Sequence, residues 1–168
     1  MSTSLVVVFL DIDGVLNSER SAIEHEGHPE KFGSYHMEAL NRLVELSGAV
    51  VVVSSTWRWG RSAARLQCIL DEQGFKGKVL DRTGHFQVRN EDGAHVWAKR
   101  GEEIQEWLTD RAASNPDEKL DFVILDDDRD MLHLMDHLVW TGAENGGPQP
   151  GLLLEHVEPA MALLKDIH

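Results

Sequence analysis

Apolar runs of strand length alternate along this chain with amphipathic stretches of helix length, and this alternation constrains the fold more than any other feature. Four runs rich in Val, Leu and Ile, and a weaker fifth, have the unbroken apolar character of strands buried on both faces. They are residues 5–10, 49–53, 122–125 and 137–141, with 78–80 as the weaker one. Apolar residues at helical spacing predict helices over residues 35–47, 61–73, 101–113 and 155–167. The sequence therefore predicts an α/β fold with a central parallel sheet of about five strands and helices on both faces.

The rest of the chain shows no linker and no internal repeat, so residues 1–168 are predicted to form a single domain. Residues 17–34 and 81–98 fit neither a strand nor a helix pattern, and the Gly- and Pro-rich residues 142–151 are predicted to form a loop. No apolar run approaches the roughly 20 residues that cross a bilayer, and the N-terminus lacks the pattern of a signal peptide. We therefore expect no membrane partner and a cytoplasmic location.

The chain has one cysteine, Cys68, which leaves it without an internal disulfide partner. Cys68 lies in an apolar helical pattern with Leu66, Ile69 and Leu70. Such a pattern favours a buried, unreactive thiol over a nucleophile. We therefore expect Cys68 to belong to the core.

The charge of the chain bears on its partners. Its 16 Lys and Arg and 29 Asp and Glu give a formal net charge of −13, which argues against nonspecific coating of a nucleic-acid duplex. The charge is uneven: residues 58–111 hold ten basic and nine acidic residues, a net charge of +1, and the remainder carries −14. A nucleic acid bound locally, at this nearly neutral part of the chain, therefore remains compatible with the composition.

Acidic residues follow two of the predicted strands directly. Asp11 and Asp13 come after the first strand, and Asp126 and Asp127 after the run at 122–125. Ligands of open parallel sheets bind beyond the carboxyl ends of the strands, so these side chains are expected to meet at one edge. Carboxylates gathered there repel one another unless a hard divalent cation, which we expect to be Mg²⁺, joins them. The alternative is that acids mark strand ends and cap the next helix, but two clusters after two buried strands favour the metal.

Hydroxyl and basic side chains complete a pattern that suits a phosphoryl group. Ser54 and Ser55 follow the strand at 49–53, and a hydroxyl with free backbone N–H groups at the start of a turn binds an oxyanion. Lys99 and Arg100 stand at the head of a predicted helix, where either can supply a cation to phosphoryl oxygens. Taken alone, the serines are a weak signal, because Ser-Ser-Thr also starts helices. The basic pair alone is equally typical of a solvated surface pair.

These elements, in this order, resemble the four motifs of the haloacid dehalogenase (HAD) superfamily of phosphohydrolases. The motifs are an Asp-x-Asp after the first strand, a Ser or Thr after the second, a Lys or Arg at a helix start, and an acidic pair after a later strand. The first motif, FLDIDGVLN, is highly specific. More narrowly, VVVSSTWR, RGEEIQEWL and FVILDDDRDM are similar to the small HAD domains of Swiss-army-knife RNA repair proteins. The resemblance implies a Rossmann-like HAD fold, and the short intervals at residues 17–34 and 56–98 leave room for little or no cap domain.

The resemblance also implies roles for the acidic residues. Asp11 would be the nucleophile that forms an aspartyl-phosphate, and Asp13 would protonate the leaving oxygen and then activate water. Asp11 and the backbone carbonyl of Asp13 would hold the metal together with an acid of the last motif. Asp127 is the first choice for that acid and Asp126 the second.

Other motif residues would contact the phosphoryl group. Ser54 would donate a hydrogen bond to it, with Ser55 as the alternative. Lys99 and Arg100 fit two different family spacings for the cation, and both stay open. Gly14 would permit the tight chain path after the nucleophile, close to the substrate.

The segment after Ser54 also suggests how a substrate is held. Aromatic faces stack on bases and arginines contact phosphates, so Trp57 and Arg58 are candidate substrate-binding residues for a nucleotide or polynucleotide. The alternative is that Trp57 packs in the core and that Arg58 and the nearby Arg61 are solvated.

These observations lead to one main hypothesis and its alternatives. The chain is expected to be a Mg²⁺-dependent phosphomonoester hydrolase, with a nucleotide or the phosphorylated end of RNA or DNA as a candidate substrate. A small-metabolite phosphatase and a non-catalytic phosphate- or partner-binding domain of the same fold are the alternatives. The intact Asp11 and Asp13 argue against the non-catalytic domain, which would be free to lose them.

Overall fold

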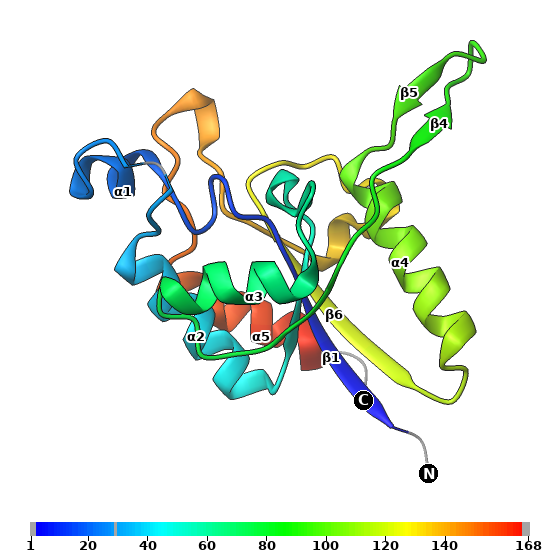
Figure 1. Ribbon diagram of the computed structural model, residues 1–168, viewed down its shortest axis with the longest axis horizontal. Helices are drawn as coiled ribbons and strands as arrows, with labels where there is room; N and C mark the ends of the chain where they lie inside the picture. The colour runs from blue at the N-terminus through cyan, green and yellow to red at the C-terminus, as the bar shows by residue number, and fades with distance from the viewer. Residues whose placement is uncertain (1–2, 29, 166–168) are drawn as a thin grey trace.

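The centre of the molecule is a five-stranded parallel sheet, seen in a computed structural model that describes residues 3–28 and 30–165 (Figure 1). The strand order is β3-β2-β1-β6-β7, and every neighbouring pair is parallel. The strands are β1 (Ser4–Leu10), β2 (Val50–Val53), β3 (Val79–Arg82), β6 (Lys119–Asp126) and β7 (Leu138–Trp140). All five predicted strands are confirmed, including the weak one, and β6 is longer than its apolar run.

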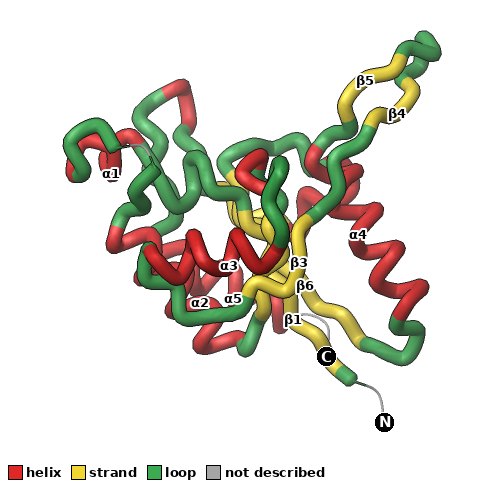
Figure 2. Tube along the Cα trace, in the orientation of Figure 1, coloured by secondary structure: helices red, strands yellow, loops and turns green. Residues whose placement is uncertain are grey.

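Helices cover both faces of this sheet, α2, α3 and α5 on one side and α4 on the other (Figures 1 and 2). The helices are α1 (Glu19–Glu24), α2 (Ser34–Ser47), α3 (Ala63–Glu72), α4 (Arg100–Ser114) and α5 (Val157–Lys165). Short 3₁₀ helices are η1 (Thr56–Arg58), η2 (Leu132–His137), η3 (Glu144–Gly146) and η4 (Leu154–His156). Along β1, Val8 and Leu10 pack toward α2, α3 and α5, whereas Val7 and Phe9 pack toward α4 and η2. This alternation buries β1 on both faces and confirms the predicted α/β architecture.

The register of the sheet decides which residues meet at its carboxyl edge. Leu10, the last residue of β1, pairs with Val53 in β2 and with Leu125 in β6. The next residues along these three strands are Asp11, Ser54 and Asp126. Three separate motifs therefore end at the same level of the sheet.

The two segments without a recognisable pattern form small elements at the margin of the body. The hydroxyl of Ser18 caps the short helix α1 by accepting from Ser21 N at 3.2 Å. Between β3 and α4, the antiparallel strands β4 (Gln87–Arg89) and β5 (His95–Trp97) form a hairpin that projects away from the sheet (Figures 1 and 2). Three-residue strands with mostly exposed side chains carry too little periodicity to be predicted. The inserts are these small elements, in keeping with the expectation of little or no cap domain.

The expectation of a buried Cys68 is wrong. Helix α3 buries Leu66 and Leu70, whereas Cys68 is exposed. Cys68 is two positions from each buried leucine, and a helix turns about 100° per residue, so its side chain lies on the opposite face. The apolar pattern predicted the helix correctly, but it placed Cys68 on the buried face of that helix, which is wrong.

Two further observations concern the ends and the length of the helices. The predicted end of the last helix at residue 167 lies outside the described residues. Within the part of the chain that is described, no helix combines the length and the apolar character that a bilayer-spanning segment requires.

Candidate active site

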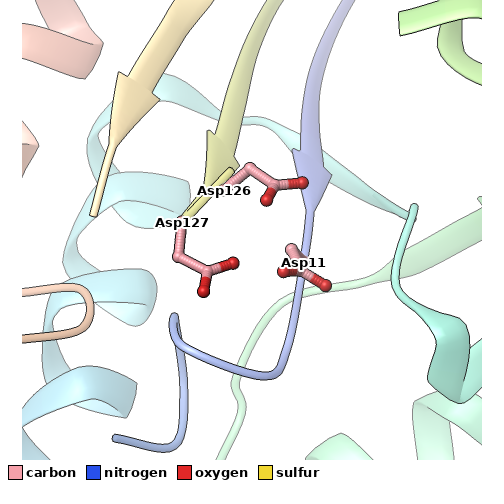
Figure 3. Close-up of side chains that lie close together, drawn as sticks. All are labelled: Asp11, Asp126 and Asp127. Atoms are coloured by element: carbon pink, nitrogen blue, oxygen red, sulfur yellow. The ribbon is translucent and has the colours of Figure 1, made fainter. Parts of the chain in front are cut away.

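Three carboxylates meet at the carboxyl ends of β1 and β6 (Figure 3). One oxygen from each of Asp11, Asp126 and Asp127 lies within 4.8 Å of the other two. Hydrogen bonds to their backbone hold two of these residues in place: Asp11 N donates to Leu125 O at 3.0 Å, and the indole Nε1 of Trp140 donates to Asp127 O at 2.7 Å. The sheet thus brings together the two acidic groups that lie more than a hundred residues apart in the chain.

Burial dominates the electrostatics of this cluster. It raises the pKa of Asp11 to about 7, with Asp127 adding to the shift, and the pKa of Asp126 to about 8, with Asp11 adding to it. The guanidinium of Arg100 opposes both shifts. One neighbouring cation does not compensate three carboxylates, so the cluster is suited to a further positive charge.

The oxygen donors of the cluster fit a hard divalent cation. Asp126 is 1% exposed, and its Oδ1 accepts from Asp128 N at 2.9 Å. Its Oδ2 is buried, has no hydrogen-bond partner among the described residues, and lies 3.7 Å from Arg100 Nε. An uncoordinated buried carboxylate oxygen is costly unless a ligand satisfies it. Asp126 and Asp127 therefore both belong to the candidate Mg²⁺ ligands, together with Asp11.

The structure separates the two candidate cations at the start of α4. Lys99 is the N-cap residue and is exposed, whereas the Arg100 side chain is 17% exposed and points at the carboxylates. Gly101 lies against Met131, the N-cap residue of η2, and an added Cβ would clash with the backbone of Met131. Only glycine lets the first turn of α4 approach so closely. In this arrangement Arg100, and not the N-cap residue Lys99, reaches the carboxylates.

The two serines after β2 have different surroundings. Both are fully buried. The Ser55 hydroxyl caps η1 by accepting from Trp57 N at 3.3 Å, whereas the Ser54 hydroxyl has no hydrogen-bond partner in the described part of the chain. Ser54 therefore has the hydroxyl that is available to a ligand, next to Asp11 across the sheet.

Asp13 lies apart from the carboxylate cluster. It is exposed, and its Oδ1 accepts from Asn17 Nδ2 at 2.9 Å and from Trp57 Nε1 at 3.0 Å. Directly after Asp13 the chain turns sharply at Gly14, which has a φ of +79° and no room for a side chain, because an added Cβ would clash with Asp127 Oδ2. The first motif thus presents one acid inside the cluster and a second one at its solvent side.

A comparison with protein-family models agrees with this geometry. The model described as "HAD domain in Swiss Army Knife RNA repair proteins" matches residues 7–147. The chain belongs to this HAD family. The match contains all four motifs, and membership indicates a phosphatase-type hydrolase or a role in RNA repair. Searches of curated proteins and of solved structures found no match.

Arg58 has a different place in this HAD domain from the one expected. Its guanidinium is buried and donates to Ser54 O at 2.8 Å and Gly84 O at 3.2 Å, and it pairs with Glu103 Oε2 at 2.7 Å. Burial lowers its pKa, and the charge of Glu103 opposes that shift. The interpretation of Arg58 as a substrate contact is wrong, because the guanidinium is directed inward and joins β2, the β3–β4 loop and α4.

Trp57 combines the two roles that the sequence left open. Its ring is half-buried and packs against Phe32 with centroids 5.5 Å apart. Its indole N–H reaches Asp13, and its side chain lines a small cavity together with that acid. Trp57 is therefore both a packing residue and part of the wall beside Asp13.

Sequence reasoning missed several residues that support the site. Thr141 is buried at the end of β7 and donates from Oγ1 to Gly14 O at 3.1 Å. Thr141 was predicted as the last residue of a strand, but it follows the apolar residues 138–140 as Ser54 follows β2, so the same signal could have found it. Asn17 closes the first motif and could have been found in FLDIDGVLN. Glu103 has no comparable signal, since its partner Arg58 comes from a distant segment.

Proposed function

We propose that this HAD domain is a Mg²⁺-dependent phosphomonoester hydrolase that uses Asp11 as its nucleophile. The observation that supports this best is the unpartnered polar chemistry around Asp11: a buried Ser54 hydroxyl and a buried Asp126 oxygen, both without hydrogen-bond partners among the described residues. The guanidinium of Arg100 lies beside that Asp126 oxygen, with its Nε 3.7 Å away. Such groups are costly in a purely structural role and are suited to a bound phosphoryl group and cation.

The proposed reaction has two steps. In the first, an Asp11 oxygen attacks phosphorus, the bond between phosphorus and the ester oxygen breaks, and Asp13 gives its proton to that oxygen. In the second, Asp13 takes a proton from water, whose oxygen attacks the aspartyl-phosphate and releases inorganic phosphate and free Asp11. Ser54 and Arg100 would bind the phosphoryl oxygens in both steps.

Asp11, Asp126 and Asp127, with the backbone carbonyl of Asp13, are the proposed ligands of Mg²⁺. When bound, the cation would offset the negative charge of the carboxylates and of the phosphoryl oxygens, so that the two can approach. The position of Asp13 supports its separate role, because Asn17 and Trp57 hold it outside the carboxylate cluster.

We further propose that the substrate is a nucleotide or the phosphorylated end of RNA or DNA. The family to which the chain belongs is named for RNA repair proteins, and residues 58–111 are nearly neutral in a strongly acidic chain. The hairpin and α1 lie at the margin of the body rather than over it as a cap domain, which leaves room for a large substrate (Figure 1). A cytoplasmic location stays a prediction.

Hydrolysis of p-nitrophenyl phosphate tests the reaction. The purified protein with Mg²⁺ is expected to release p-nitrophenol, and Asp11→Asn to abolish the release, because the amide is not a nucleophile. Asp110→Asn, an exposed acid on α4, is the matched control and should leave the rate unchanged. An Asp11→Asn variant that is as active as the wild type would exclude Asp11 as the nucleophile.

A further inference from the structure

Three rings from three separate segments stack beside the base of the β4–β5 hairpin. Trp59 follows η1, His85 lies between β3 and β4, and Trp97 ends β5. The rings of His85 and Trp97 are parallel within 12°, with centroids 4.1 Å apart, and those of Trp59 and His85 are 4.7 Å apart at 36°. We call this group the ring stack.

The ring stack is open to solvent. Trp59 is 52% exposed and Trp97 is 58% exposed, and neither belongs to the two hydrophobic cores. His85 stacks on one face of Trp97 and lies tilted against Trp59, and about half of each tryptophan stays exposed beside it. Two neighbouring tryptophans exposed to this extent contribute little to the core, and exposed apolar groups of this kind mark binding sites.

Buried polar contacts fix the ring stack relative to the catalytic edge of the sheet. His85 Nδ1 and Glu103 Oε1 are 3.0 Å apart, and the other oxygen of Glu103 pairs with Arg58 at 2.7 Å. Arg58 in turn donates to the backbone carbonyl of Ser54 at 2.8 Å. The position of the rings is therefore coupled through three short contacts to the strand end that carries Ser54.

A cavity connects the ring stack with the proposed catalytic acid. It has a volume of about 360 Å³ and is lined by Asp13, Thr56, Trp57, Trp59 and Arg61. The exposed Arg61 side chain donates to Trp57 O at 2.9 Å and lies over the Trp57 ring. The lining of this cavity therefore combines an acid, a guanidinium and aromatic side chains.

We propose that the ring stack is a stacking platform for the bases of a single-stranded nucleic-acid end. With the terminal phosphate at Asp11, the adjoining nucleotide would occupy the cavity, Arg61 would contact its phosphodiester, and the outer face of Trp59 would stack on a base. Trp97 extends the aromatic surface for a base further along the strand. This inference rests on the proposed function and narrows its substrate to single-stranded ends, because the bases of a duplex already stack on one another.

Kinetics on matched substrates test the platform. The probes are short 3′- and 5′-phosphorylated single-stranded RNA and DNA oligonucleotides, the same oligonucleotides with an abasic terminal nucleotide, and p-nitrophenyl phosphate. For Trp59→Ala and Trp97→Ala, the ratio of kcat/KM for the preferred oligonucleotide to that for p-nitrophenyl phosphate is expected to fall about 5- to 100-fold. Trp59→Phe and Trp97→Phe should keep most of that ratio because the aromatic face remains. Val96→Ala, on the same hairpin, is the control for hairpin integrity and should not change it.

A binding measurement separates this inference from the proposed reaction. Fluorescence anisotropy of a labelled oligonucleotide with the Asp11→Asn protein reports binding without turnover, and Trp59→Ala or Trp97→Ala in that background should weaken it by a similar factor. Loss of binding in the alanine variants supports the platform even if the wild type hydrolyses no phosphate. Absence of hydrolysis would overturn only the proposed reaction. Unchanged oligonucleotide selectivity in the alanine variants, or equal use of the abasic substrate, would overturn the platform and leave the reaction standing.

Discussion

Two buried arginine–carboxylate pairs involve the first turn of α4 and differ in how completely they are satisfied. Arg58 Nη2 lies 2.7 Å from Glu103 Oε2, and both side chains are at most 5% exposed. The other Glu103 oxygen contacts His85. Arg100 Nε lies 3.7 Å from Asp126 Oδ2, an oxygen without a hydrogen-bond partner among the described residues. We call the Arg58–Glu103 pair closed because both Glu103 oxygens have partners, although Arg58 Nε has none among the described residues. The Arg100–Asp126 pair is open.

This difference distinguishes a structural ion pair from a binding site. Taking charges out of water is costly, and a close pair recovers that cost only through good geometry and additional hydrogen bonds. Glu103 meets this condition with both oxygens. Asp126 does not, and a phosphoryl group with its cation is the kind of ligand that would complete its surroundings.

Breaking the closed pair should have the largest effect. Arg58→Met leaves Glu103 as an uncompensated buried charge, so urea denaturation is expected to show a loss of about 3–5 kcal/mol in the free energy of unfolding. Arg42→Met, which removes a solvent-exposed pair with Glu45, is the control and should cost at most about 1 kcal/mol. Adding Glu103→Leu to Arg58→Met should recover part of the loss, because no unpaired charge remains. An equal loss of unfolding free energy in Arg58→Met and Arg42→Met would contradict a structural role for the buried Arg58–Glu103 pair.

Removing the cation of the open pair should act on activity instead. Arg100→Ala is expected to lower kcat/KM for a phosphate ester about 100- to 1000-fold, the scale found for a lost donor to a developing anion. The free energy of unfolding should change far less than in Arg58→Met, because Arg100 is not closely paired. Lys99→Ala, at the exposed N-cap, should have a much smaller effect on kcat/KM. The reverse order would assign the phosphate-binding cation to Lys99.

Binding of Mg²⁺ beside the Arg100–Asp126 pair should stabilise the folded protein. Mg²⁺ at 100 times its dissociation constant is expected to raise the free energy of unfolding by about 2.7 kcal/mol. Denaturation with and without EDTA measures this gain. The gain should be lost in Asp126→Asn and kept in Asp136→Asn, an exposed acid of η2. A wild-type protein that is equally stable with and without Mg²⁺ would contradict the metal site.

A third buried polar group, His36, also has its hydrogen-bonding atoms paired, and we expect a smaller effect from changing it. Its Nδ1 lies 2.6 Å from Leu152 O and its Nε2 2.9 Å from Ser18 Oγ, so the neutral ring is fully satisfied. Burial lowers the pKa of His36. A histidine with a lowered pKa favours the folded state above its unfolded pKa of 6.5 and loses that contribution as the pH falls through its folded value.

Acidification from pH 7 to 5 should therefore reduce the melting temperature through His36. Thermal melts of the wild type and of His36→Gln over this range measure the effect. The glutamine variant, which has no titrating ring, should lose less stability on acidification. If the melting temperatures of the two proteins fell equally with pH, titration of His36 would not contribute to the pH dependence of stability.

The sequence predicted most of the fold because the sheet is buried on both faces. Unbroken runs such as 5–10 and 122–125 correspond to β1 and β6, and helical spacing predicted α2, α3, α4 and α5. The β4–β5 hairpin was missed because its strands are three residues long and exposed, which leaves no hydrophobic period to detect.

The candidate site was predicted in part, for a reason that concerns distance along the chain. Strand-end residues such as Asp11, Ser54 and Asp126 are visible as polar residues after apolar runs, although their catalytic roles stay predictions. The partner of a loop residue is not visible in this way. Arg58 pairs with Glu103 and Trp57 bonds to Asp13 across 44 positions, and both contacts depend on the folded arrangement of α4, η1 and β1. Local pattern therefore predicted which polar residues meet at the sheet edge and not the contacts that position them.

The register between β1 and β6 has a consequence for how this domain can diversify. The two strands pair from Ser4 with Lys119 to Leu10 with Leu125. A single inserted or deleted residue in either strand would shift the motif acids by about 3.3 Å and turn the following side chains to the opposite face. The hairpin and the α1 region carry no such constraint, because their length does not enter the pairing. Exchange of these inserts in a descendant or an engineered variant would therefore change the surface around the sheet edge while Asp11, Ser54 and Asp126 stay at the same level.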